Sequence, residues 1–139
     1  MQFMPTVRIG NATECLQLVP EPGVGAPEVL VATLEVEGVT ATRSVVNNYT
    51  TGFQDLADFF GGMADAWRGW LDARSWESIE GDLRLEARHE HGRVRLTVTL
   101  RHDRAGWTNH GWRVTADLGM EPGEQLAQIA RDVAALAAG

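Results

Sequence analysis

The chain has 139 residues, of which 44% are hydrophobic and 22% are charged, and its formal net charge is −7. This length and composition predict a single globular domain, residues 1–139, that can bury a core without metal or disulfide support. The negative charge argues against a nucleic-acid partner, because sequence-independent binding to phosphates depends on positive charge.

Cys15 is the only cysteine, which excludes an internal disulfide and a zinc site built from several cysteines. No apolar run approaches the roughly 20 residues needed to cross a bilayer, so no membrane association is expected. Residues 1–5 lack the basic region and apolar core of a secretion signal. We therefore expect a cytoplasmic protein in which Cys15 is a buried, small apolar side chain.

Four strands are predicted in the first third of the chain. Residues 6–9 and 14–19 form an opening pair around a turn. Residues 29–36 and 39–46 alternate apolar and polar side chains around a second turn, which is typical of a hairpin.

The register of this hairpin has one irregular feature. Pairing Val36 with Val39 places Leu34 opposite Ala41, but it also places Arg43 on the apolar side opposite Ala32. Either Arg43 lies near an edge with its guanidinium group in water, which we favour, or it is a paired interior charge.

A helix is predicted to begin near Thr51 and to end at Arg74. Thr51 and Gln54 have the spacing of a capping box. Gly61 and Gly62 lower the helix propensity in the middle, so we expect a bend or a close approach of the helix backbone to the sheet. One stripe of residues has helical spacing and is expected to face the core: Phe53, Leu56, Ala57, Phe60, Ala64, Trp67 and Leu71.

The opposite side of this helix is acidic. It carries Asp55, Asp58, Asp65 and Asp72. These carboxylates are either a solvated helix face or a negative patch that meets a basic protein.

Residues 83–100 carry the most regular pattern in the chain. Two alternating runs flank His91 and Gly92, a tight-turn dipeptide. With these two residues at the centre of the turn, Leu85 faces Val98 and every apolar side chain falls on one face. A slip by one residue would turn the apolar groups into water, so the pattern predicts this register alone.

Residues 112–118 alternate again and predict a seventh strand, and residues 121–136 predict a closing helix. The order is ββββ-α-βββ-α, without the alternation of a parallel sheet and without a repeat. We predict an α+β domain in which a curved antiparallel sheet packs with two helices.

Few residues have a spacing typical of a catalytic or metal-binding site. The hairpin register spreads His89, His91 and His102 along the strands, so they cannot share a metal ion, and His110 falls in a predicted loop. No serine lies in a nucleophile-elbow sequence, Cys15 lacks basic surroundings, and the chain has no lysine for a phosphate loop. We therefore expect no enzymatic activity, no metal and no cofactor.

The tryptophans indicate two candidate contact regions. Trp107 falls in a polar loop, where a tryptophan is typical of a contact anchor for a protein partner. Trp67 fits the core stripe of the predicted helix, and Trp76 is expected to seal that helix against the sheet. As an alternative to these structural roles, Arg43, Trp67 and Trp76 could line a ligand pocket between sheet and helices.

Three groups of residues form distinctive motifs: Phe59-Phe60 with Trp67-Arg68-Gly69-Trp70; Ser75-Trp76-Glu77-Ser78-Ile79-Glu80-Gly81-Asp82-Leu83-Arg84-Leu85; and Met120-Glu121-Pro122-Gly123-Glu124-Gln125-Leu126. Together they resemble a family of small bacterial proteins that is similar to predicted immunity proteins of wall-associated toxins, the WapI immunity type. The resemblance implies a non-enzymatic domain that neutralises a co-encoded toxin, and it transfers no catalytic residue to this chain.

Two functions are compatible with these observations. The first is a protein-interaction domain of immunity type, which binds a basic protein such as a toxin domain through Trp107 and the acidic helix face. The alternative is a small-molecule-binding module that uses the pocket of Arg43, Trp67 and Trp76. The sequence carries no signal for an oligomeric state.

Overall fold

The computed structural model describes residues 6–103 and 111–139, and in these ranges it has eight strands and two helices. The predicted α+β class with antiparallel strands and two helices is confirmed. The strands are β1 (Val7–Gly10), β2 (Cys15–Pro20), β3 (Val29–Val36), β4 (Val39–Val46), β5 (Ala73–Glu77), β6 (Leu83–Glu90), β7 (Arg93–Asp103) and β8 (Gly111–Met120). The helices are α1 (Gln54–Asp65) and α2 (Glu124–Ala138).

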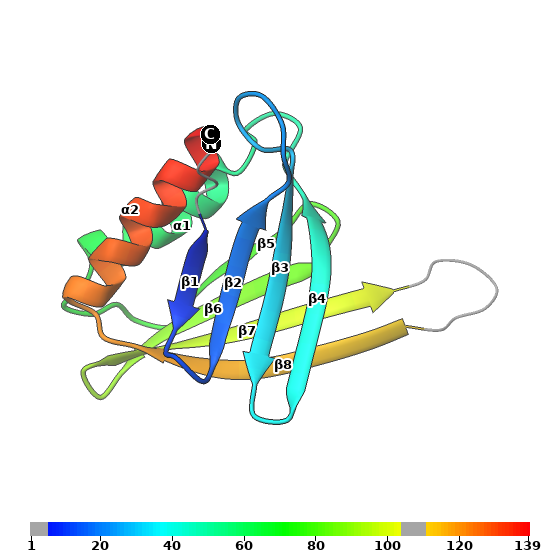
Figure 1. Ribbon diagram of the computed structural model, residues 1–139. Coiled ribbons are helices and arrows are strands. Elements are labelled where there is room, and N and C mark those ends of the chain that lie inside the picture. The colour runs from blue at the N-terminus through cyan, green and yellow to red at the C-terminus, as the bar shows by residue number, and fades with distance from the viewer. Residues whose placement is uncertain (1–5, 104–110) are drawn as a thin grey trace.

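The strands form two four-stranded sheets rather than one curved sheet. The first has the order β1-β2-β3-β4 and the second β5-β6-β7-β8, and all neighbours are antiparallel. The strands of the first sheet run steeply across those of the second, while α1 and α2 lie side by side along one side of the pair (Figure 1). Neither helix is long and apolar enough to cross a membrane.

The predicted register of the β6–β7 hairpin is confirmed. Leu85 pairs with Val98, His89 with Val94 and Glu90 with Arg93. His91 and Gly92 have φ values of 53° and 75°, so both central residues of the turn adopt the left-handed conformation that a type I′ hairpin turn requires.

The register of the β3–β4 hairpin is also confirmed, with Ala32 opposite Arg43. Our favoured interpretation of Arg43 is right about its position near an edge but wrong about a guanidinium group in water. Its Nη2 atom lies 3.2 Å from Oδ1 of Asp82, and the side chain of Arg43 is only 27% exposed. β4 is an edge strand of the first sheet, so the arginine can reach past the core and pair with the second sheet.

Helix α1 is shorter than predicted. It ends at Asp65, its N-cap is Phe53, and no side chain caps it, so the expected capping box of Thr51 and Gln54 does not form. The chain leaves the helix through Gly69, which has a φ of 138°, and enters a strand that the helical spacing had concealed.

The glycine pair in α1 makes room for a side chain of β5. A Cβ atom on Gly62 would lie 2.8 Å from an Nη1 atom of Arg74, whereas a Cβ atom on Gly61 would meet nothing within 4 Å. The close approach expected at this point therefore exists, but it is made by an arginine side chain rather than by the sheet backbone.

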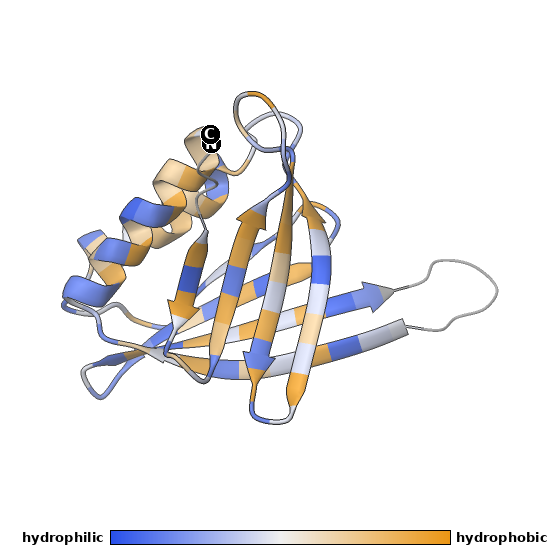
Figure 2. Ribbon diagram, viewed as in Figure 1, coloured by the Kyte–Doolittle hydropathy of each residue, from blue (hydrophilic) through white to orange (hydrophobic). Residues whose placement is uncertain are grey.

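The inner faces of both sheets and one face of each helix form a single hydrophobic core. Figure 2 shows the alternation of apolar and polar residues along the strands that makes such a core possible. Cys15 is buried as predicted, and Trp76 is buried in β5, next to α1.

Candidate functional site

The four predicted acidic residues do not form one helix face. Asp55 is half-buried and its carboxylate accepts a hydrogen bond from the backbone N–H of Leu56 at 2.8 Å. Asp58 and Asp65 are exposed on α1. Asp72 lies beyond the helix, where it is exposed and has a φ of 59°. The prediction that Asp72 belongs to the acidic face of this helix is therefore wrong.

The proposed pocket residues lie at different places along β6. Arg43 contacts Asp82, just before the start of β6, whereas the carbonyl of Trp67 contacts His89 near its end. These two points are seven residues apart along an extended strand. At about 3.3 Å per residue, the distance between them is roughly 23 Å. Trp76 is paired with Leu85 between them. The structure therefore does not bring the three side chains into one pocket. Trp107, the other predicted anchor, lies outside the described residues.

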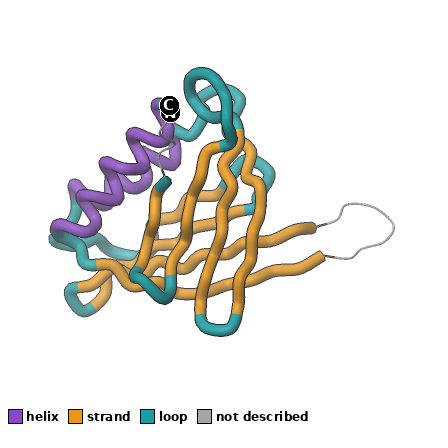
Figure 3. Tube along the Cα trace, in the orientation of Figure 1, coloured by secondary structure: helices purple, strands orange, loops and turns teal. Residues whose placement is uncertain are grey.

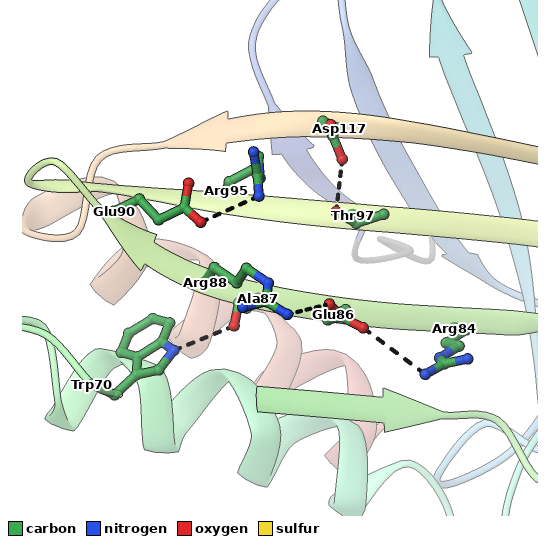
Figure 4. Close-up of polar contacts among 9 residues, drawn as sticks. All are labelled: Trp70, Arg84, Glu86, Ala87, Arg88, Glu90, Arg95, Thr97 and Asp117. Atoms are coloured by element: carbon green, nitrogen blue, oxygen red, sulfur yellow. Dashed lines mark hydrogen bonds and ion pairs between the residues drawn. The ribbon is translucent and has the colours of Figure 1, made fainter. Parts of the chain in front are cut away.

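Residues 66–72, which we call the Trp67 loop, join α1 to β5 and run as a loop beside the second sheet (Figure 3). The indole N–H of Trp70 donates a hydrogen bond to the carbonyl of Ala87 at 3.3 Å (Figure 4). The ring of His89 packs edge-on against Trp70, with centroids 5.3 Å apart, and its Nε2 atom lies 3.1 Å from the carbonyl oxygen of Trp67. The guanidinium group of Arg74 stacks over Trp70 at 5.3 Å. These contacts fix the loop backbone against β6.

The same loop presents large apolar side chains to solvent. Trp67 is 48% exposed and Leu71 is 92% exposed. Arg68 covers part of the Trp67 ring, with its guanidinium carbon 5.1 Å from the ring centroid. Both exposed side chains were expected in the core, because the predicted helix continued beyond its true end. The loop thus combines an anchored backbone with an exposed tryptophan and an exposed leucine.

The motif around residues 76–83 has a structural explanation. The hydroxyl of Ser78 accepts a hydrogen bond from the backbone N–H of Leu83 at 3.1 Å, and the carbonyl of Ser78 accepts one from Gly81 at 2.8 Å. Gly81 has a φ of 76°, a conformation that disfavours other residues. The serine therefore shapes the β5–β6 turn.

This turn holds two arginines from other strands. Arg101 of β7 donates from Nε to the carbonyl of Gly81 at 2.7 Å, and its Nη2 atom lies 3.6 Å from a carboxylate oxygen of Glu77. Arg43 of β4 pairs with Asp82. The turn thus joins both sheets and positions Arg101 on the outer face of the second sheet.

That outer face is rich in arginine and in polar pairs. Thr97 donates to the carboxylate of Asp117 at 2.6 Å, and Arg95 pairs with Glu90 at 3.2 Å (Figure 4). A shallow depression at the other end of this face has a volume of about 140 Å³. It is lined by Glu77, Gly81, Arg84, Thr99, Arg101, Arg113 and Thr115.

The sequence alone did not single out this depression. The alternation of β6 and β7 places Arg84 and Arg101 on the polar face, a signal that was available. The position of Arg113 beside Arg101 depends on the register in which β7 pairs with β8. The sequence predicts no tight turn between these two strands from which that register could be inferred.

Within residues 6–103 and 111–139, no group of three or more histidine, cysteine, aspartate or glutamate residues is arranged to hold a metal ion. The described histidines near aromatic rings take part in packing contacts: His89 with Trp70, and His102 with Trp112 at a centroid distance of 6.4 Å.

Comparison with known proteins identifies the family of the chain. No curated protein and no solved structure matches the chain. The model described as "Family of unknown function (DUF6228)" matches residues 19–139, from the end of β2 to the last residue, and these include the Trp67 loop and the β5–β6 turn. The chain belongs to this family of unknown function.

Proposed function

We propose that this chain is a non-enzymatic protein-interaction domain and that the Trp67 loop is the centre of its contact surface. The observation that carries the proposal is the combination of a fixed loop backbone with exposed Trp67 and Leu71 side chains. Tryptophan is enriched among the residues that dominate binding energy at protein interfaces.

The anchoring of the loop favours tight binding. A loop that is already held by hydrogen bonds and ring contacts loses little conformational entropy when a partner binds. Trp70, His89 and Arg74 provide these contacts, and none of them needs to move for Trp67 and Leu71 to be covered.

The surroundings of the loop favour a basic partner. Asp65 is the last residue of α1, two positions before Trp67, and Asp72 follows Leu71 directly. Asp58 lies on the same side of α1 as Asp65, because seven residues make close to two helical turns. These exposed carboxylates and the net charge of −7 complement a positively charged protein surface, which increases the rate of association and disfavours acidic competitors.

Together with the resemblance to WapI-type immunity proteins, this surface leads us to propose a basic toxin domain as the partner. The chain would neutralise that domain by covering part of its surface, a role that requires no catalytic group.

The test is to co-purify the chain with the product of each adjacent gene and to measure the affinity of any complex by calorimetry. We expect Trp67→Ala and Leu71→Ala each to weaken the complex at least tenfold, and the double reversal of Asp58 and Asp65 to arginine to weaken it further. Tyr49→Ala is the matched control, because Tyr49 is 81% exposed but lies before α1, outside the Trp67 loop.

Two results would overturn the proposal. One is a complex whose affinity does not change in Trp67→Ala and Leu71→Ala. The other is a homodimer in sedimentation that Trp67→Ala dissociates, because the loop would then be an interface between two copies of this chain.

A further inference from the structure

The depression on the outer face of the second sheet collects positive charge in a chain that is acidic as a whole. Arg84 of β6, Arg101 of β7 and Arg113 of β8 line it, together with one carboxylate, that of Glu77. Three guanidinium groups therefore meet one carboxylate in the lining, and a second carboxylate, that of Glu86, lies outside the lining at 3.9 Å from Arg84.

The pairing of β7 and β8 makes this arrangement unfavourable in the absence of a ligand. Arg101 and Arg113 are direct cross-strand partners, and like charges in that position repel. The carboxylate of Glu77 lies 3.6 Å from Arg101, and Arg113 forms no ion pair with any side chain that the structure describes. An anion between the two strands would replace this repulsion with attraction.

The β5–β6 turn fixes one of the guanidinium groups in place. Arg101 donates to the carbonyl of Gly81, and a Cβ atom at Gly81 would collide with the Arg101 guanidinium group. Gly81 is therefore required both for its positive φ and for the space that Arg101 occupies. This pre-organisation lowers the entropy that binding an anion would cost.

Two hydroxyl groups complete the lining. Thr99 and Thr115 face each other across β7 and β8, and their Oγ1 atoms share a hydrogen bond of 3.1 Å. Whichever hydroxyl accepts that bond keeps its own hydrogen and can donate it to a ligand oxygen.

We propose that this depression binds the phosphate group of a phosphate monoester. A phosphate monoester carries about −1.5 to −2 charges at neutral pH and three strong acceptor oxygens, which match the three guanidinium groups and the hydroxyl donors of the lining. The volume of about 140 Å³ is well below the roughly 300–1,000 Å³ of pockets that enclose drug-sized ligands. Only the phosphate group is held, and the rest of the ligand extends into solvent.

This site is independent of the proposed protein-contact surface. Arg84 lies near the start of β6 and His89, which contacts the Trp67 loop, lies near its end. They are five residues apart along an extended strand. At about 3.3 Å per residue, the distance between them is roughly 17 Å.

The test is a titration of the chain with inorganic phosphate at constant ionic strength, followed by amide chemical shifts and by the melting temperature. We expect saturable shifts at Thr99, Arg101, Arg113 and Thr115, and a melting temperature that rises with phosphate concentration. Arg113→Gln should weaken phosphate binding about tenfold, the usual effect of losing a charge-assisted hydrogen bond.

Arg93→Gln is the matched control. Arg93 is exposed and, eight residues before Arg101 in β7, lies on the same face of the strand at its other end. Its replacement removes the same charge, so phosphate affinity should change less than twofold. Without phosphate, Arg113→Gln should be at least as stable as the original chain, because a cross-strand repulsion is removed.

Three results would overturn the proposal: equal shifts with chloride, equal weakening in Arg93→Gln and Arg113→Gln, or acetate binding as tight as phosphate. Two further titrations distinguish the source of the phosphate group. Tighter binding of a phosphoserine peptide than of glycerol phosphate would identify a phosphorylated protein, and the reverse order would identify a small phosphate ester.

Discussion

The guanidinium group of Arg43 lies 3.2 Å from the carboxylate of Asp82, and this ion pair joins the edge of the first sheet to the β5–β6 turn of the second. The side chains are 27% and 11% exposed, so the pair is largely removed from water. Arg43 also donates from Nε to the carbonyl of Arg101 at 3.3 Å. The two sheets are thus connected by polar contacts as well as by the hydrophobic core.

Removing the carboxylate should therefore destabilise the fold. In Asp82→Ala, Arg43 would keep its charge at a part-buried site without its carboxylate partner. We expect a loss of about 2 kcal/mol in the free energy of unfolding, measured by urea denaturation. The control is Glu86→Ala, since Glu86 forms exposed ion pairs with Arg84 and Arg88 that contribute less than about 1 kcal/mol (Figure 4). Equal losses in the two variants would contradict the role assigned to Asp82.

The His91–Gly92 turn predicts opposite effects for two substitutions. Gly92→Ala should cost about 1 kcal/mol, because alanine disfavours the φ of 75° although a Cβ atom would meet nothing within 4 Å. His91→Asn should add about 0.5 kcal/mol, because Asn-Gly is the preferred pair for this type of turn. Gly23→Ala serves as the control, since Gly23 has no positive φ and a Cβ atom there is unobstructed. Thermal unfolding of the three variants measures the effects, and a destabilised His91→Asn would contradict the predicted turn conformation.

The two glycines of α1 should respond differently to alanine. Gly61→Ala should stabilise the chain by about 1 kcal/mol, because alanine favours the helix and the site is open. Gly62→Ala should gain less or nothing, because Arg74 must move from its position over Trp70. Urea denaturation gives the free energies, and near-ultraviolet circular dichroism reports the change around Trp70. Equal stabilisation by both substitutions would show that Arg74 does not restrict Gly62.

Two tryptophans close together in sequence should differ sharply in their contribution to stability. Trp76→Ala should cost about 3–5 kcal/mol, since it leaves a cavity in the core. Trp67→Ala should cost less than about 1 kcal/mol, because half of the side chain is already exposed. The comparison uses chemical denaturation of both variants. A large loss in Trp67→Ala would mean that Trp67 supports the fold, and its exposure could no longer be assigned to partner binding.

The sequence predicted those features that depend on neighbouring residues in a strand pair. Alternation has a period of two, so a wrong register would expose Leu85 and Val98 together, and only one pairing around His91 and Gly92 avoids this. The same reasoning fixed the β3–β4 register, including the position of Arg43.

The end of α1 could not be derived in the same way. Trp67 and Leu71 have helical spacing, but helical spacing shows only that a helix would be amphipathic. The competing interactions are non-local: β5 pairs with β6, Trp70 bonds to Ala87, and His89 meets the Trp67 carbonyl. These contacts join residues between 7 and 22 positions apart and become visible only when the strands are assembled.

The sequence by itself therefore determined the α+β class, the two hairpin registers and the apolar face of each strand that it predicted, because side-chain direction in a strand depends on position alone. The tertiary structure decided how the strands divide into two sheets, which charge faces Arg43, and which residues remain outside the core at the Trp67 loop. It also brought Arg113 beside Arg101. Such contacts depend on the relative placement of distant segments, and local periodicity carries no information about that placement.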